Sequence, residues 1–412
     1  MKKIFKLILA MVLCLSVSVV AFACDLGDHD HEYESGWTTN ESYHWHACTF
    51  AGCGLTVDKA GHEFDEGVID SYATPITEGV KTFTCTVCGY AKSENFAFDG
   101  VTVSTIEELN DALATGGTIA LGADIQTANT IYPTVDTTII GCGKTITYTG
   151  TNRAIDVIAD TNGASLTLVN LTISSTANWC ERGVNYNTTG TLTLDNVTIA
   201  ATRQNYAVNL PGMSDGAKVV INNSEITSFI ALNIWGENTE ITITNSDLYS
   251  VGSTETDCGG AISINVDAGS HADNCTLTVE GGKISSLYTD NTPALAIRNY
   301  ADATVISISE TTQVVGDIIN DSCVATVAYP PTYYFYAYKT LQDAVDRNAS
   351  DLKNGTTNSK VVLTSDITVE TLVVLSEVVI DLNGYTLTVT TLTDEGNALT
   401  IIGNGVYNGV QQ

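Results

Sequence analysis

Leu166-Thr-Leu-Val-Asn170-Leu-Thr-Ile173 is the stretch that decides the fold, because its pattern of apolar residues around an Asn returns along the chain. Successive copies begin 22 to 36 residues apart, and a Gly replaces the Asn in the fifth copy. The other copies are Leu192-Thr-Leu-Asp-Asn196-Val-Thr-Ile199, Val219-Val-Ile-Asn-Asn223-Ser-Glu-Ile226, Ile241-Thr-Ile-Thr-Asn245-Ser-Asp-Leu248 and Leu277-Thr-Val-Glu-Gly281-Gly-Lys-Ile284. Short apolar strands that return at such intervals predict a solenoid.

A second apolar series accompanies the first, as in Ala154-Ile-Asp-Val, Gly183-Val-Asn-Tyr and Ala207-Val-Asn-Leu. Neither series has helical periodicity, which excludes the helical repeat arrays. If each strand pairs with its copy in the next coil, about 4.8 Å away, the coils form a parallel β-helix. The sequence therefore predicts an all-β fold, a parallel β-helix over residues 99–332.

The equivalence of Asn and Gly has a conformational reason, since both residues tolerate the left-handed backbone region needed at a sharp corner. Stacked Asn side chains can also form an amide ladder between coils. In these features, residues 99–332 resemble the right-handed, pectate-lyase-like β-helices. The resemblance implies a right-handed solenoid.

A capping helix is expected at Ile106–Leu113, where it would cover the open end of the coil stack. The same order of helix, strand and Asn-Gly corner returns after residue 333, with Leu341-Gln-Asp-Ala-Val345 and Asn383-Gly384. Residues 333–412 are therefore predicted to begin a second β-helix. Because 80 residues hold only about three coils, we expect this second unit to be incomplete or very short.

The composition excludes several classes of partner. The 412 residues carry a formal charge of −30, which disfavours nucleic acids and anionic membrane surfaces. Charged residues make up only 16% of the chain and hydrophobic residues 44%, so the chain is predicted to fold.

The first 23 residues read as a secretory signal peptide. Lys2, Lys3 and Lys6 precede an apolar run, and Ala21-Phe22-Ala23 is typical of signal-peptidase cleavage. Cys24 follows directly, so a lipid anchor at Cys24 is the alternative to free secretion. No other segment has the length and hydropathy of a membrane span. We expect a bacterial protein that is secreted or held at the cell surface.

Residues 24–98 contain most of the chemistry-bearing side chains. Five of the six histidines lie between residues 29 and 62, close to the pairs Cys48/Cys53 and Cys85/Cys88. Two cysteine pairs of this kind can close a tetrahedral zinc site, and two local disulfides are the alternative. His31-Glu32-Tyr33 returns as His62-Glu63-Phe64, which suggests two half-units and allows mixed sites. The predicted structural-zinc ligands are Cys48, Cys53, Cys85, Cys88, His62 and His44, whereas the acidic run with His29 and His31 is expected to be a solvated tail.

The same segment resembles a small zinc-ribbon-like repeat of exported bacterial surface proteins. The resemblance is carried by Trp37, His44-Trp45, the first Cys pair with Gly54, His62-Glu63-Phe64 and Thr84-Cys85-Thr86-Val87-Cys88-Gly89. The chain departs from the repeat by a four-residue gap in the first pair and by lacking a His after the second. The resemblance implies an exported surface protein.

Strand alternation predicts where a ligand would bind. If Val184, Val208 and Leu232 face the core, Asn185, Asn209 and Asn233 should form an exposed column. With Trp235 and Arg298 beside it, the column would offer amides to sugar hydroxyls and a ring to a sugar face. The alternative is a solubilising face whose amides satisfy one another.

Two classes of function follow. The first is a non-enzymatic adhesion or glycan-binding protein, whose partner is an extracellular polysaccharide or a host or cell-surface component. The second is a divergent polysaccharide lyase or glycoside hydrolase, as the pectate-lyase-like resemblance implies. The acid/base and Arg motifs of those enzymes are missing from the sequence, which favours the first class and leaves no catalytic residue to name.

Overall fold

The computed structural model describes most of the chain after residue 29. The described residues are 30–158, 163–176, 181–200, 206–251, 260–264, 272–286, 295–299, 301, 304–315, 317–320, 324–329, 333–338, 340–396 and 398–409. The predicted signal segment 1–23 and the lipid-anchor candidate Cys24 lie outside them. The chain divides into two units, Met1–Phe98 and Asp99–Gln412. Among the described residues, no helix has the length and hydropathy to cross a membrane.

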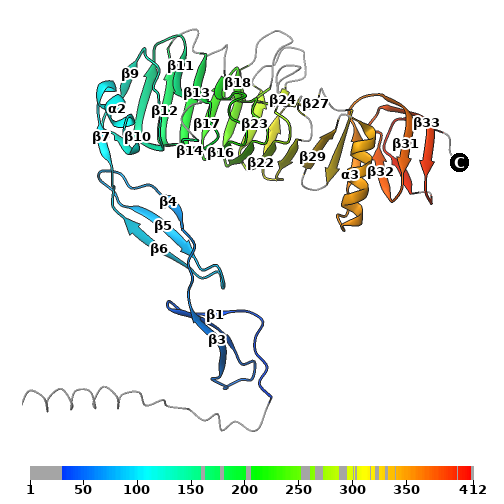
Figure 1. Ribbon diagram of the computed structural model, residues 1–412, viewed down its shortest axis with the longest axis horizontal. Coiled ribbons are helices and arrows are strands. Elements are labelled where there is room, and N and C mark those ends of the chain that lie inside the picture. Colours follow the sequence, from blue (N-terminus) through cyan, green and yellow to red (C-terminus); the bar gives the residue numbers. More distant parts are fainter. Residues whose placement is uncertain are drawn as a thin grey trace, which may run out of the picture. The chain divides into compact units, whose positions relative to one another are not determined.

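The first unit consists of two small antiparallel sheets, each of three strands (Figure 1). The first sheet holds β1 (Thr38–Thr39), β2 (Tyr43–Ala47) and β3 (Thr56–Gly61), and the second holds β4 (Val68–Ser71), β5 (Gly79–Thr84) and β6 (Ala91–Phe96). Few side chains of this unit are fully buried, so its apolar core is small. A fold with so little core needs another source of stability.

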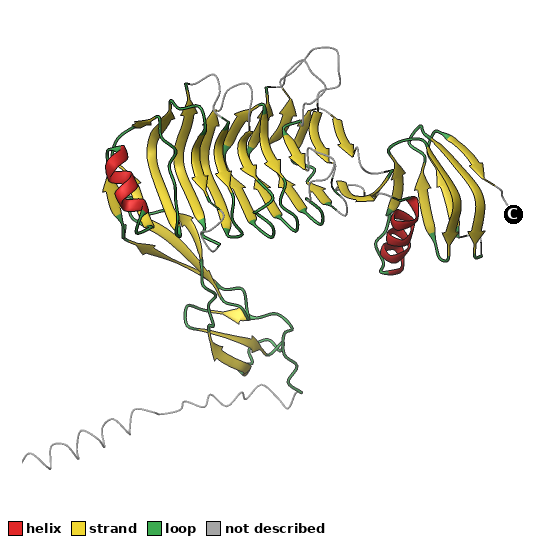
Figure 2. Cartoon of the chain, turned by 45° about the horizontal axis from the view of Figure 1, so that its top comes forward, coloured by secondary structure: helices red, strands yellow, loops and turns green. Residues whose placement is uncertain are grey.

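The second unit contains a long sheet in which each strand pairs in parallel with its copy in the next repeat (Figure 2). The first three strands are unbroken, and the later ones are split into pairs of shorter strands. These strands are β10 (Thr137–Tyr148), β12 (Leu166–Ser175), β14 (Thr191–Ala200), β16 (Lys218–Asn222), β17 (Glu225–Ser228), β19 (Glu240–Thr244), β20 (Asp247–Ser250), β22 (Thr276–Glu280), β23 (Lys283–Ser286), β25 (Val305–Ile308) and β26 (Gln313–Val315).

The second apolar series forms another parallel sheet of seven strands. Its strands follow one another in sequence order, and Val184, Val208 and Leu232 are register partners. They are β11 (Arg153–Val157), β13 (Arg182–Tyr186), β15 (Tyr206–Leu210), β18 (Ile230–Ile234), β21 (Ile262–Ile264), β24 (Leu295–Asn299) and β27 (Asp317–Asn320). The chain is thus mostly β-strand with long parallel sheets, consistent with a β-helix-like solenoid.

The predicted corner residues do adopt the left-handed conformation. The φ values are +47° at Asn170, +53° at Asn196, +50° at Asn223 and +48° at Asn245, and +71° at Gly281. Asn196 donates its Nδ2 hydrogen to Asn170 Oδ1 at 3.2 Å, which is one step of the predicted ladder. Asn223 departs from the ladder, because its amide donates to Asp195 Oδ1 at 3.4 Å.

The predicted capping helix is present as α2 (Ile106–Leu113), next to β7 (Val101–Val103), β8 (Gly117–Leu121) and β9 (Ile125–Thr127). Thr105 and Glu108 form a capping box, in which each side chain accepts a hydrogen bond from the other residue's main-chain N–H. Leu109 and Leu113 are buried in the core of the coil stack. The helix therefore covers apolar residues at this end of the sheets (Figure 1).

The last part of the second unit has its own hydrophobic cluster, and its strands pair partly in parallel, as in the preceding coils, and partly antiparallel. The helix α3 packs beside the strands. The elements are β28 (Ala325–Tyr329), β29 (Tyr333–Tyr338), α3 (Leu341–Lys353), β30 (Lys360–Leu363), β31 (Ile367–Val374), β32 (Val378–Asp381), β33 (Thr386–Asp394), β34 (Leu399–Ile402) and β35 (Val406–Gly409).

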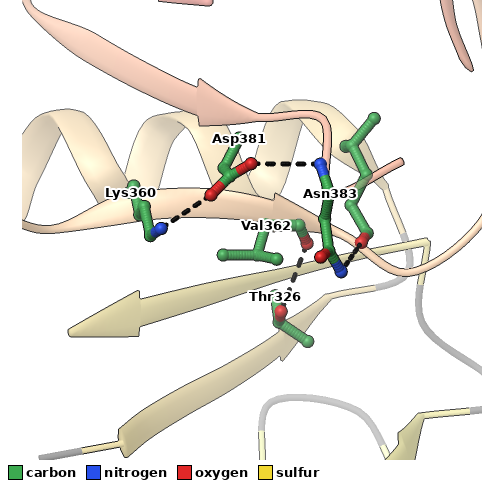
Figure 3. A network of polar contacts seen from close by, with 6 residues as sticks. Thr326, Lys360, Val362, Asp381 and Asn383 are labelled. Carbon is green, nitrogen blue, oxygen red and sulfur yellow. Dashed lines mark hydrogen bonds and ion pairs between the residues drawn. The ribbon is translucent and has the colours of Figure 1, made fainter. Parts of the chain in front are cut away.

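A polar network ties β28, β30 and the corner after β32 together (Figure 3). Lys360 Nζ lies 2.6 Å from Asp381 Oδ2, and Asp381 Oδ1 accepts the main-chain N–H of Asn383 at 3.0 Å. The Asn383 amide donates to the Leu363 carbonyl at 3.2 Å. Asn383 has a φ of +47°, so this second stack uses the same Asn corner as the first.

Candidate metal centre

Four of the six predicted metal ligands meet in one place, although they come from distant parts of the first unit. His44 lies on β2 and His62 follows β3, whereas Cys85 and Cys88 follow β5. Their candidate ligand atoms all lie within 4.8 Å of one another. Cys88 Sγ is 3.4 Å from His62 Nδ1, and Cys85 Sγ is 4.0 Å from His44 Nδ1. We call these residues the four-ligand cluster.

The spacing of the four-ligand cluster fits a tetrahedral ion. With metal–sulfur bonds of about 2.3 Å and metal–nitrogen bonds of about 2.0–2.1 Å, neighbouring ligand atoms lie about 3.4–3.8 Å apart. The two distances between Sγ and Nδ1 atoms lie at or near that range. His44 and Cys85 are each only 2% exposed, so two of the four ligands are enclosed. A partly buried set of two thiols and two imidazoles can hold a metal ion.

The other nitrogen of His62 is held by the main chain. Its Nε2–H donates to the Asn40 carbonyl at 2.7 Å, and this bond raises the pKa of His62 above its ordinary value. Asn40 is fixed in turn, because its Oδ1 accepts the main-chain N–H groups of Ser42 and Tyr43 at 2.9 and 2.8 Å. Such a bond orients a ligating imidazole and fixes its tautomer, leaving Nδ1 for the metal.

The surroundings of the Cys85 side chain favour its thiolate form. Burial alone would raise its pKa, but hydrogen bonds from the backbone N–H groups of Cys88 and Val87, together with the His62 side chain, lower the pKa to about 6. Gly89, with a φ of +76°, turns the chain so that its N–H bonds the Cys85 carbonyl at 2.9 Å. A thiolate is the form of cysteine that binds metals.

The remaining predicted ligands, Cys48 and Cys53, lie in a separate cluster with His31. The Nδ1 atom of His31 is 3.6 Å from each of the two Sγ atoms. The expectation that His31 belongs to a solvated tail is therefore wrong, because its ring is held beside both thiols although the residue is exposed. His29 lies outside the described residues. We call His31, Cys48 and Cys53 the three-ligand cluster.

The two clusters are built alike, as the repeated His-Glu-aromatic motif predicts. Tyr33 forms an antiparallel bridge with Cys48, and Phe64 forms the same bridge with Cys85. The residue after each cysteine then binds the motif's glutamate: the N–H of Thr49 donates to the Glu32 carbonyl, and that of Thr86 to the Glu63 carbonyl, both at 2.8 Å. All four cysteines are free thiols.

The predicted ligand-binding column is not exposed. Asn185, Asn209 and Asn233 are 1%, 4% and 0% exposed. Each amide donates to the previous coil at 2.7 Å, Asn233 to Asn209, Asn209 to Asn185, and Asn185 to Asp156. The expectation of an exposed column is wrong because these strands are buried on both faces, so alternation does not place one face in water.

Trp235 and Arg298 do not complete such a surface. Trp235 follows β18 and is half-buried, and its main-chain N–H donates to the Leu210 carbonyl at 2.7 Å. Arg298 is also half-buried but lies on β24, with β21 between it and β18. The described structure therefore gives these two residues no common exposed face with the asparagines.

A shallow, open cavity that sequence analysis did not identify lies on the surface of the first coils of the second unit. Its volume is about 570 Å³, and it is lined by residues 128–130, Tyr132, Tyr148 and residues 150–152. Two loops meet here, one after β9 and one between β10 and β11. The Tyr132 side chain is 47% exposed, and none of the lining residues carries a charge.

No family model matches the chain, and no curated protein matches it. Among solved structures the chain is similar to one titled "L. reuteri 53608 SRRP", at 17% identity and a TM-score of 0.35, over 76% of this chain and 99% of that chain. A TM-score of this size does not define a shared fold. The evidence for function therefore comes from the side chains of this chain and their geometry.

Proposed function

We propose that this chain is an exported bacterial surface protein that binds a neutral extracellular glycan without turning it over. In this proposal residues 1–23 are a signal peptide, residues 99–332 form a right-handed, pectate-lyase-like β-helix, and residues 333–412 begin a second one. The observation that carries the binding function is the uncharged cavity beside Tyr132.

The lining of the cavity suits a sugar. Exposed amides of Asn129 and Asn152 and the hydroxyls of Thr130 and Thr151 can donate to and accept from sugar hydroxyls. The exposed ring of Tyr132 can cover an apolar sugar face. Because the lining has no cation and the chain carries a charge of −30, a neutral saccharide is favoured over a uronic-acid polymer.

The two loops around the cavity are fixed before any ligand binds. The N–H of Thr149 donates to the Thr127 carbonyl at 2.8 Å, and the N–H of Asn152 donates to the Tyr148 hydroxyl at 3.1 Å. The hydroxyl of Thr127 also bonds the Asn129 carbonyl at 3.0 Å. A preformed site loses less entropy on binding. The lining includes no carboxylate or imidazole to act as acid or base, which supports binding without chemistry.

We further propose that the four-ligand cluster binds one structural zinc ion. Two thiolates and two imidazoles in a tetrahedral arrangement are typical of structural zinc. The metal would supply the stability that the small core of the first unit lacks. In the extracellular setting, disulfides are the competing state of these thiols.

Binding of neutral and acidic polysaccharides to the full chain tests the glycan proposal. Tyr132→Ala should weaken binding of a neutral polysaccharide about fivefold or more, since a stacked ring contributes about 1 kcal/mol or more. Tyr385→Ala is the matched control, because Tyr385 is 37% exposed in the second stack and lies far along the chain. Equal binding by both variants, preference for uronic-acid polymers, or release of shortened products would contradict the proposal.

A further inference from the structure

The three-ligand cluster differs from the four-ligand cluster by one residue. His31, Cys48 and Cys53 correspond to His62, Cys85 and Cys88 through the shared bridges and main-chain bonds of the two half-units. No residue of the three-ligand cluster corresponds to His44. Among the described residues, no further His, Cys, Asp or Glu joins this cluster.

The repeat explains the missing ligand. His44 stands 18 residues before His62, on the strand β2 of the preceding half-unit. The same step back from His31 reaches Leu13, an apolar residue in the predicted signal segment. Among the described residues, no half-unit precedes the first cysteine pair that could offer it an equivalent of His44.

The three donors present can still hold an ion. The 3.6 Å separations of His31 Nδ1 from Cys48 Sγ and Cys53 Sγ match the edges of about 3.6 Å expected between sulfur and nitrogen ligands of tetrahedral zinc. His31 is exposed and Cys53 half-buried, in contrast to the buried His44 of the other cluster. Three protein ligands with one position left for another molecule is the arrangement of open zinc sites.

We propose that His31, Cys48 and Cys53 hold a second divalent metal ion of the zinc type, whose fourth position binds an external imidazole or thiolate donor, with water in its place otherwise. The two thiolates neutralise the charge of the ion, and a soft or borderline donor suits the remaining position. The first unit then carries two unequal metals, one closed and structural, the other open to a ligand. The open site at the three-ligand cluster and the structural zinc at the four-ligand cluster have only one requirement in common, which is that the cysteines are reduced.

Cobalt substitution in the full chain, reduced and kept free of oxygen, tests the open site. The wild type should bind two Co²⁺ per chain, and His31→Ala should bind one. Imidazole or 2-mercaptoethanol should change the visible absorption of the wild type and leave the spectrum of His31→Ala unchanged. His31→Cys, which restores a donor, should recover the second equivalent.

Each other outcome identifies which idea fails. Two Co²⁺ per chain in His31→Ala would overturn the open site, as would a wild-type spectrum that does not change when imidazole or 2-mercaptoethanol is added. Neither result would contradict the proposal of a structural zinc ion. If Cys24→Ser or His29→Ala has a cobalt spectrum that differs from that of the wild type, the fourth donor lies within the chain. That result would also overturn the open site. Binding of no cobalt by the reduced chain would overturn both metal proposals.

Discussion

His62 donates its Nε2–H to the main-chain carbonyl of Asn40 at 2.7 Å, on the side of the ring opposite the thiol of Cys88. One ring nitrogen therefore binds the scaffold while the other faces the candidate metal position. The Asn40 side chain fixes the turn that supplies this carbonyl, through bonds to the N–H groups of Ser42 and Tyr43. A residue that touches no ligand atom of the cluster thus controls the orientation of one ligand.

Asn40→Ala should weaken zinc binding at the four-ligand cluster by about tenfold or more, the usual cost of losing an outer-shell partner. The variant removes the two turn bonds that hold the Asn40 carbonyl in place. Competition with a chromophoric chelator measures the affinity. Asn40→Asp keeps an oxygen acceptor for both N–H groups and should bind zinc nearly as the wild type does. Equal loss in both variants would show that the turn bonds are not the cause.

Asn209→Ala should destabilise the second unit by about 2–3 kcal/mol, because it leaves a buried acceptor on Asn185 and a buried donor on Asn233 without partners. Asn152→Ala, at an exposed position, should change the free energy of unfolding by less than about 0.5 kcal/mol. Denaturant unfolding of both variants provides the comparison. Similar values for the two would mean that the buried ladder contributes little.

Asn223→Leu should destabilise the coil stack by about 1–2 kcal/mol, because Leu in the left-handed region brings its Cβ against the following carbonyl. Asn223→Gly should cost much less, since Gly adopts a φ of +50° without strain. The Asn223 side chain makes one long bond of 3.4 Å, so its loss adds little. If the Gly variant proved as unstable as the Leu variant, side-chain bonding would matter more than the corner conformation.

Removal of metal should unfold the first unit and leave the second folded. The first unit has a small core and depends on its ligands, whereas the second buries an extended core of its own. A chelator added to the reduced chain should abolish the near-ultraviolet signal of Trp37, which is half-buried and stacks on the His46 ring with the ring centroids 4.0 Å apart. The melting temperature of the coil stack should not change. A shift in that temperature would show that the stability of one unit depends on the other.

Much of the second unit could be predicted from sequence because its pattern is local and repeated. The spacing of Asn170, Asn196, Asn223 and Asn245 indicated both the parallel strands and the left-handed corners that the structure contains. Each copy of the repeat has the same pattern of apolar residues around an Asn or Gly. Several copies together therefore support a strand assignment that one short copy would not. The capping helix could be predicted from the local pattern of Ile106–Leu113, and the structure adds the Thr105–Glu108 capping box at its start.

The features that could not be predicted depend on contacts between segments that are distant in the sequence. Strand alternation predicts that Asn209 faces water, but its strand is buried on both faces, and its amide is hydrogen-bonded to a neighbouring coil. The cavity joins two loops some 20 residues apart that have no shared pattern. His31 was missed because its acidic neighbours suggested a solvated tail, although its repeat with His62 was already visible.

Zinc content of His44→Ala against His46→Ala tests the metal centre most directly. The two histidines lie two residues apart on β2, but only His44 joins the four-ligand cluster, while His46 Nδ1 bonds the Gly36 carbonyl at 3.0 Å. In reduced full chain, His46→Ala should keep the zinc content of the wild type and His44→Ala should lose one equivalent per chain. Equal zinc in both variants, or no zinc in the wild type with two intact disulfides by mass spectrometry, would contradict a metal held by His44, His62, Cys85 and Cys88.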